Sequence, residues 1–441
     1  MFADLLNSKR GPWVICGAIA VLAAVIYGFG SHERPGFKVI TVHPAGNVWD
    51  AALSPDGSRV AMTWRERYGR SSTDVHEAIE IKDVRSDKEI ASFTLPPRNW
   101  NLGQQSSVDR SLQYCDHGKY LLAFAGPDAL MAVDTTSLSI HFGITLGTLP
   151  PLPAPDQPVR WLTFLPFSSN VTVRCSTDTP YVVLATWGDM QASSVKVFDL
   201  EKGTEVADLS RAYAGRYAGG GVAISPDGSR AAVETWSNAN DGGQVEVIDI
   251  SRVSRVSTLS LGPRGALPPN DSLAFAGNNA VLIGERKCQD GDSFCDFRPH
   301  PRVIRDWNFS ADREARELSS PGAYNYQYFS GSADGHVAFS YSGSEGYCTS
   351  CNSGGGETKV SDARFRIWDR TSGRIIAESP RLKVEKHSCF LVITIGSCTS
   401  YERVPELQMS DDGKAVLAFM PLTSEDAPDR KPRPLLVFLR R

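Results

Sequence analysis

The chain has 441 residues, of which 41% are hydrophobic and 22% are charged, and its formal net charge is −4. This composition excludes a disordered or collagen-like chain, and the slightly negative charge excludes a generally basic nucleic-acid binder. The apolar content is sufficient to bury a large core.

The first predicted element is an uncharged apolar run at residues 13–30, with the sequence WVICGAIAVLAAVIYGFG. A membrane-spanning helix needs roughly 17–25 apolar residues, so we expect one transmembrane helix here. No convincing small-residue cleavage pattern ends the run, which favours an uncleaved signal anchor over a removed signal peptide. We predict a short cytoplasmic tail at residues 1–12, a linker at 31–36, and residues 37–441 on the periplasmic or extracellular side.

An internal repeat follows the apolar run. Residues 51–63 read AALSPDGSRVAMT, residues 222–234 read VAISPDGSRAAVE, and residues 407–419 read LQMSDDGKAVLAF. Each copy places a polar turn containing Asp-Gly between two short apolar strands. Weaker or looser copies begin at positions 111, 161, 272 and 328, which gives seven copies in total.

A third, alternating strand follows the second strand of most copies and ends in aspartate. The aspartates at this position are Asp83, Asp199, Asp249 and Asp369. We interpret them as turn-forming residues rather than catalytic carboxylates, because aspartate readily bonds its own backbone at the start of a turn.

Seven copies of a four-stranded unit predict an all-β fold, a seven-bladed β-propeller with antiparallel blades. The last copy stops after its third strand, PLLVFLRR, whereas the segment FKVITV at residues 37–42 has no partner of its own. We expect residues 37–42 to supply the fourth strand of the last blade, because this pairing removes an exposed sheet edge.

The Ser-Pro-Asp-Gly turn and the Ile367-Trp368-Asp369 strand ending resemble those of the WD-repeat and TolB-like propeller families. The resemblance covers residues 37–441 in outline. The Gly-His dipeptide of WD repeats is missing, so the buried His–Ser–Trp network of that family is not implied, and the TolB-like family fits better. Propellers host many activities, so the resemblance implies a fold rather than a function.

The cysteines that follow the apolar run are even in number, which in a translocated domain indicates disulfides. We expect two local pairs, Cys288–Cys295 and Cys389–Cys398, and a pair between the equivalent first turns of neighbouring blades, Cys115–Cys175. The remaining two, Cys348 and Cys351, form a C-x-x-C pattern in the loop CTSCNSGGG.

Two other roles for these cysteines stay open. A zinc site would use Cys348 and Cys351 with two further thiolates, such as Cys288 and Cys295, although a C-x₆-C spacing is not typical of zinc modules. A redox role for the C-x-x-C pattern would need a helix N-terminus to lower the thiol pKa. We prefer structural disulfides, and we expect no metal and no cofactor.

Long connections are expected on one face of the propeller, at residues 65–77, 285–302, 342–363, 380–406 and 421–434. Long loops on a rigid scaffold are common binding sites. Four aromatic residues end second strands at matching repeat positions, namely Trp64, Trp187, Trp236 and Tyr341. They are candidates for binding a sugar-like or flat ligand, and packing between adjacent blades is the alternative.

The sequence contains no G-x-S-x-G elbow, P-loop, H-E-x-x-H or paired dinucleotide motif, and we assign no catalytic residue. We therefore expect a membrane-anchored binding or protein-interaction scaffold rather than an enzyme. One alternative is a propeller hydrolase or quinoprotein-like dehydrogenase with its site at the central channel. The other is a structural envelope protein.

Overall fold

A computed structural model of the chain describes residues 36–67, 74–94, 98–99, 107–109, 112–124, 129–146, 160–164, 170–187, 193–213, 216–237, 243–261, 273–286, 302–311, 315–318, 326–342, 357–358, 363–383, 385–387, 400–403, 405–421 and 432–441. The predicted transmembrane segment, residues 13–30, lies outside these ranges, as do the predicted tail and residues 31–35 of the linker. Within the described ranges, no helix has the length and apolar character needed to cross a membrane.

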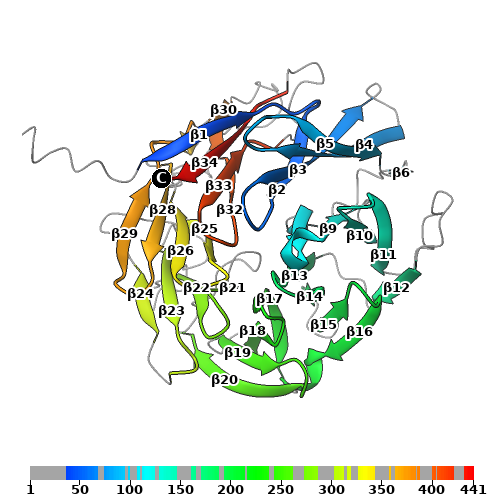
Figure 1. The fold of residues 1–441 in the computed structure, drawn as a ribbon. Helices are drawn as coiled ribbons and strands as arrows, with labels where there is room; N and C mark the ends of the chain where they lie inside the picture. The colour runs from blue at the N-terminus through cyan, green and yellow to red at the C-terminus, as the bar shows by residue number, and fades with distance from the viewer. Residues whose placement is uncertain are drawn as a thin grey trace, which may run out of the picture.

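Seven antiparallel blades surround a central axis, as Figure 1 shows. Among the four repeat strands of each blade, the first lies nearest the axis and the fourth lies farthest from it. The first blade contains β2 (Val48–Leu53), β3 (Arg59–Arg67), β4 (Asp74–Asp83) and β5 (Glu89–Thr94). The second contains β8 (Leu112–Cys115), β9 (Tyr120–Phe124), β10 (Ala129–Asp134) and β11 (Ser139–Leu146). The third contains β13 (Asn170–Cys175), β14 (Tyr181–Trp187), β15 (Ser194–Asp199) and β16 (Thr204–Asp208).

The other four blades continue the ring. The fourth contains β17 (Tyr217–Ile224), β18 (Arg230–Trp236), β19 (Gln244–Asp249) and β20 (Ser254–Ser260). The fifth contains β21 (Leu273–Phe275), β22 (Val281–Arg286), β23 (Arg302–Trp307) and β24 (Arg316–Leu318). The sixth contains β25 (Tyr326–Gly331), β26 (Val337–Ser342), β28 (Arg364–Asp369) and β29 (Arg374–Glu378). The seventh contains β32 (Glu406–Met409), β33 (Ala415–Phe419), β34 (Leu435–Arg440) and β1 (Phe37–Val42).

A few short elements lie outside this plan. Additional strands pair with the first three blades, namely β6 (Arg98–Asn99), β7 (Ser107–Asp109) and β12 (Arg160–Phe164). A separate three-stranded sheet contains β27 (Glu357–Thr358), β31 (Ser400–Arg403) and β30 (Glu385–His387). Two short 3₁₀ helices are η1 (Asp116–Gly118) and η2 (Leu209–Arg211).

The pairing of β1 with β34 closes the ring as the sequence predicted. The two strands run antiparallel, with Phe37 opposite Arg440 and Val42 opposite Leu435. The Phe37 ring packs edge-on against Phe365, with 5.1 Å between the ring centroids. The first described strand of the chain therefore completes the last blade, and the all-β, seven-bladed propeller predicted from the repeats is confirmed.

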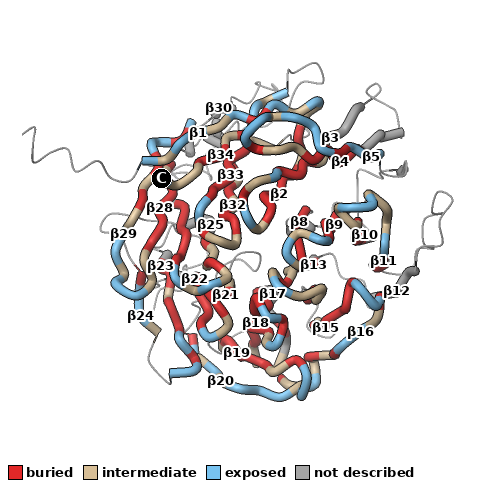
Figure 2. The backbone as a smooth tube through the Cα atoms, in the orientation of Figure 1, coloured by how far each residue is buried: buried red, intermediate tan, exposed pale blue. Residues whose placement is uncertain are grey.

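The middle strands of each blade are apolar because neighbouring blades cover both of their faces. Every residue of β33, with the sequence AVLAF, is buried, whereas the outermost strand β20, with the sequence SRVSTLS, is mostly exposed. Figure 2 shows the same contrast around the whole ring. Buried apolar side chains form seven clusters among the described residues, one at each junction between neighbouring blades. The core is therefore divided among the blade junctions.

A β-bulge interrupts the outermost strand at the same place in five blades, and the sequence did not predict it. The extra residue is an exposed aliphatic in three of them, at Ile90, Val206 and Val256. Bulges bend edge strands and discourage the addition of a further strand. The closing strand β1 pairs with β34 in a regular register.

Candidate functional site

The two faces of the propeller differ in their connections. The turns after the first and third strands are short and form what we call the turn face, which is marked by the turns at Gly57, Gly228, Gly335 and Gly413. The connections after the second and fourth strands leave from the opposite side, which we call the loop face. The five long connections predicted from the sequence all leave from strand ends on the loop face. Parts of two of them, 342–363 and 380–406, form the sheet of β27, β31 and β30, and much of the remainder lies outside the described residues.

Each Asp-Gly turn on the turn face is held by a local hydrogen-bond network. In the first blade, the Ser54 hydroxyl donates to Asp56 Oδ1 over 2.7 Å and accepts from the Arg59 amide over 2.9 Å. Gly57 adopts a φ of 69°, a left-handed conformation that favours glycine. The same Ser–Asp bond recurs in three other blades, at Ser225–Asp227, Ser332–Asp334 and Ser410–Asp412.

These turns are also bonded to one another around the axis. The Asp178 amide donates to the Pro226 carbonyl over 2.9 Å, and the Asp412 amide donates to the Pro55 carbonyl over 3.2 Å. Comparable bonds join neighbouring first turns at six blade junctions. The turn face is therefore a nearly continuous ring of hydrogen-bonded turns around the end of the axis.

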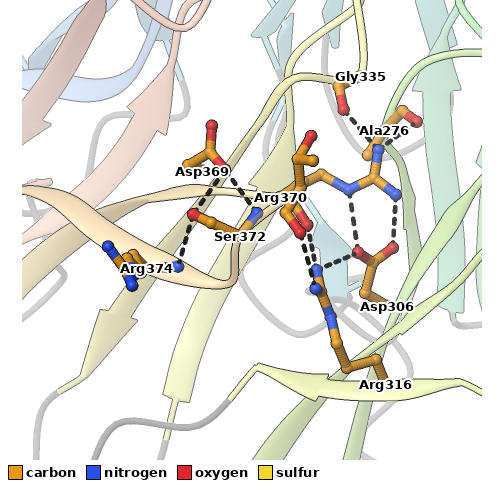
Figure 3. Close-up of polar contacts among 9 residues, drawn as sticks. Ala276, Asp306, Arg316, Gly335, Asp369, Arg370, Ser372 and Arg374 are labelled. Atoms are coloured by element: carbon orange, nitrogen blue, oxygen red, sulfur yellow. Dashed lines mark hydrogen bonds and ion pairs between the residues drawn. The ribbon is translucent and has the colours of Figure 1, made fainter.

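An arginine clamp strengthens this face between the fifth and sixth blades, as Figure 3 shows. Arg370 donates to both carboxylate oxygens of Asp306, over 2.5 and 3.3 Å. It also donates to the carbonyls of Ala276 and Gly335, over 3.2 and 2.6 Å. Arg316 reaches the same carboxylate over 3.3 Å. A single side chain thus joins two blades through four hydrogen bonds.

The four aspartates predicted to form turns do so. The amide three residues further along donates to each carboxylate, for example Ser86 to Asp83 and Arg252 to Asp249, over 2.8 and 3.0 Å. The Ser86 and Ser251 hydroxyls, together with these amides, lower the pKa of Asp83 and Asp249 respectively. A lowered pKa suits a structural acceptor, because the carboxylate stays ionised at neutral pH.

A cavity of about 160 Å³ lies on the axis between the first strands of the blades. The residue two positions before the turn serine, or its equivalent, lines the cavity in six blades, namely Gln113, Arg174, Ala223, Ala274, Ser330 and Gln408. On the side formed by the fourth to seventh blades, the apolar residues Ile224, Phe275, Phe329 and Met409 lie beside the polar residues Ser330, Gln408 and Asp411. Polar and apolar groups therefore share this side of the cavity.

Two glutamines that line the cavity bind the backbone of the next blade. Gln113 Nε2 donates to the Val173 carbonyl over 2.8 Å, and Gln408 Oε1 accepts from the Leu53 amide over 2.8 Å. Arg174 Nη1 donates to the carbonyl of the preceding Val173 over 2.9 Å. These bonds fix the polar groups that border the cavity.

At the turn-face end of the cavity, Thr177 of the third blade and Asp411 of the seventh both line the wall. Burial raises the pKa of Asp411 to about 6, although the nearby Thr177 hydroxyl acts in the opposite direction. The nearby carboxyls of Asp178 and Asp412 raise this pKa further, and His117 lowers it. His117 Nδ1 lies 3.7 Å from Asp178 Oδ1.

The four aromatic residues predicted to bind a ligand are spread around the ring, and none lines the cavity. Trp64 lies inside β3, three residues before its end, and Trp236 ends β18. Both are half-buried, and their indoles pack against Gly46 and Gly243. Tyr341 is fully buried in the cluster between the sixth and seventh blades. Trp187 ends β14, and its side chain lies outside the description. Ligand binding by these four residues stays a prediction.

One of the predicted disulfides is present. Cys115 and Cys175 are bonded, and they join the first strands of the second and third blades at the turn-face end. Cys175 also lines the cavity. The other predicted disulfide cysteines lie outside the described residues, and these are Cys288, Cys295, Cys348, Cys351, Cys389 and Cys398.

Part of a polar core contact also appears in the sixth blade. Trp368 Nε1 donates to the Ser340 hydroxyl over 2.7 Å, and both residues are buried. The sequence did not imply such a Ser–Trp bond, because the Gly-His dipeptide of WD repeats is missing. The bond satisfies the indole N–H that burial would otherwise leave without an acceptor.

Sequence reasoning missed the cavity residues, although the repeat contained a signal. At the position two before the turn serine, the first and fourth copies have Ala52 and Ala223, whereas the third has Arg174. At the second turn position, two copies have proline and the last has Asp411. A charged residue that replaces alanine or proline in a repeat indicates a local role beyond the repeat itself.

Among the residues that the structure describes, no group of three or more His, Cys, Asp and Glu side chains is arranged to hold a metal ion.

The sequence matches no protein-family model and no curated protein. Solved structures with a similar fold include hydrazine synthase of Kuenenia stuttgartiensis, at 15% identity and a TM-score of 0.48, covering 88% of this chain and 94% of that one. The β-propeller domain of Myceliophteria thermophila Cps50 (Swd1) has 11% identity and a TM-score of 0.48, covering 92% and 99%. U3-55K has 13% identity, a TM-score of 0.48 and the same coverage.

Proposed function

We propose that this seven-bladed propeller is a membrane-tethered binding scaffold outside the cytoplasm, and that a protein partner docks on its loop face. The difference between the two faces carries the proposal. The turn face is a ring of short turns bonded to one another, whereas every long predicted connection leaves from the loop face. Long connections on a rigid scaffold are the usual place for recognition. Of the two propeller families that the repeat resembles, we propose that this chain is closer to the TolB-like one.

The disulfide supports the location outside the cytoplasm. Cys115 and Cys175 lie with 5.3 Å between their Cα atoms, which is within the range that a disulfide requires. Stable disulfides are typical of exported proteins and rare in the cytosol. Together with the apolar run at residues 13–30, this pair supports a single-pass anchor with the propeller in an oxidising compartment.

Site-specific photocrosslinking in the source cells tests the docking face. A photoreactive amino acid is placed in the full chain at Ser237, which follows β18 on the loop face, or at Ser251, which follows β19 on the turn face. Both positions belong to the fourth blade, so they differ only in the face that they report. We expect a discrete crosslinked protein from position 237 and none from 251. Equal crosslinking from both faces, or none from either, would contradict the proposal.

Mass spectrometry of protein alkylated before cell lysis tests the location. A peptide containing oxidised Cys115–Cys175 is expected, and sodium carbonate should leave the full chain in the membrane fraction. Free thiols at both positions would place the propeller in a reducing compartment, and release by carbonate would remove the anchor from the proposal. A parallel metal assay tests the zinc alternative for the remaining cysteines.

A further inference from the structure

The axial cavity has the features of a small-molecule site that is separate from the proposed protein-docking face. Its volume of about 160 Å³ is close to that of an engineered cavity of about 150 Å³ that admits a benzene ring. A ligand of roughly that size would be enclosed by the first strands of six blades. The cavity thus has room for about the volume of a small amino acid.

A negative and a positive side chain lie at different heights along the cavity. Thr177 and Asp411 lie at the turn-face end, and Arg174 precedes Thr177 by three residues. Arg174 belongs to β13, which ends at Cys175, whereas Thr177 and Asp411 belong to the turns that follow the first strands. A negative group therefore lies at the turn-face end, and a positive group starts from a strand nearer the loop face.

The cavity also has apolar lining. Ile224, Phe275, Phe329 and Met409 contribute apolar surface from the fourth to seventh blades. A ligand that fills the cavity therefore meets a positive group, a negative group and apolar surface. Few small molecules combine the three complementary groups within this volume, and the apolar α-amino acids do.

We propose that the axial cavity binds a small apolar α-amino acid, with its ammonium group on Asp411 and Thr177 and its carboxylate on Arg174. The ammonium group offsets the cost of holding the Asp411 carboxylate away from water. The aliphatic side chain packs on the apolar lining.

Ligand-observed NMR titration of the full chain in detergent tests this proposal with three probes. L-Leucine has both charges, isopentylamine has only the positive one, and 4-methylpentanoate has only the negative one. We expect leucine to bind at least tenfold more tightly than either analogue, because each loses a charge-assisted hydrogen bond. If leucine does not bind, or if isopentylamine binds as tightly as leucine, the proposal is wrong.

Three variants assign the charges to residues. Arg174→Gln and Asp411→Asn should each weaken leucine binding about tenfold or more. Asp412→Asn is the matched control, since Asp412 adjoins Asp411 but does not line the cavity. Thermal unfolding identifies any variant that fails to fold. The comparison of the three probes uses the unmodified chain, so it tests the proposal even if a variant does not fold. Unchanged leucine affinity in folded Asp411→Asn would overturn the assignment.

The pH dependence supplies an independent readout. Burial raises the pKa of Asp411 to about 6; Asp178 and Asp412 raise it further, and Thr177 and His117 lower it. Only the ionised carboxylate attracts the ammonium group, so leucine should bind roughly tenfold more weakly at pH 5 than at pH 7.5. The charges on leucine itself do not change in this range. Asp411→Asn should show no such dependence, and a pH-independent affinity in the unmodified chain would contradict the proposal.

Discussion

Arg370 Nη2 of the sixth blade lies 2.5 Å from Asp306 Oδ1 of the fifth, and the side chains of both residues are largely buried. The same guanidinium also bonds backbone carbonyls from both blades. The contact is therefore both an ion pair and a bridge between two sheets that share no strand. Removing one partner leaves the other charge in a poorly solvated place.

Replacement of Arg370 by methionine should lower the free energy of unfolding by about 3 kcal/mol, the usual cost of breaking a buried ion pair. The measurement is chemical denaturation of the full chain. Arg374→Met is the matched control, because Arg374 is exposed on the next strand and should change stability by less than about 0.5 kcal/mol. Equal effects of the two substitutions would show that the clamp does not stabilise the junction.

Gly413→Ala should destabilise the protein more than Gly373→Ala. Both glycines have positive φ, 68° and 69°, so alanine costs about 1–2 kcal/mol at either position. A Cβ at position 413 would also collide with the Val337 side chain, whereas at position 373 the nearest atom would be Arg316 Nη1 at 3.6 Å. Overpacking adds roughly 1–3 kcal/mol at position 413 alone. Denaturation midpoints of the two variants measure the difference, and equal midpoints would argue against close contact between the turns.

Asp411 should make the folded state less stable as pH rises. Burial raises its pKa from 3.8 to about 6, so the folded protein holds this proton more tightly than the unfolded chain does. The protonated form favours folding, and this contribution is lost as pH rises through about 6. Relative to Asp411→Asn, the unmodified protein should lose about 2 kcal/mol of stability between pH 4 and pH 7.5.

Denaturation of both proteins at the two pH values tests the expected loss. Asp249→Asn serves as a control of opposite sign, because hydrogen bonds from Ser251 and Arg252 lower the pKa of Asp249. The stability that the ionised Asp249 carboxylate contributes is present above the pKa that Asp249 has in the unfolded chain, and it is lost as pH falls. A stability difference for Asp411→Asn that does not vary with pH would mean that the carboxyl is well solvated.

Deletion of residues 37–42 should destabilise the seventh blade and leave the anchor intact. The deletion removes the buried Val42 and the ring of Phe37, a loss of about 3 kcal/mol or more. Hydrogen exchange should show faster exchange in β34, whereas β19 in the fourth blade should be unchanged. Full protection of β34 in the shortened chain would mean that β1 does not close the ring.

The repeat in the sequence was sufficient to predict the blades. The Asp-Gly turns and the alternating third strands mark local structure, and local structure repeats with the sequence. The same logic predicted the Cys115–Cys175 bond, because equivalent positions of neighbouring blades lie side by side. The closing strand was predictable because residues 37–42 had no other partner.

Features that depend on relations between blades were not predicted. The third strand of the fourth blade carries Glu246, which is fully buried and accepts from Thr235 Oγ1 over 3.0 Å. Arg216 approaches Glu246 to 3.7 Å from the connection between the third and fourth blades. The Arg216–Glu246 pair depends on how the connection between the third and fourth blades lies against the third strand of the fourth blade. The cavity escaped prediction for the same reason, since Asp411 and Thr177 belong to opposite sides of the ring.

The pairing of β1 with β34 also affects the order of folding. Synthesis delivers the N-terminal part of a chain first, and contacts between distant parts of a sequence form slowly. β1 is the first described strand to be made, yet its partner β34 is the last one made. Six blades can form before residues 435–440 are made, and during that time β1 has no partner strand. We therefore expect the pairing of β1 with β34 to be the last step of folding, and until then β1 has a free edge that another strand could pair with.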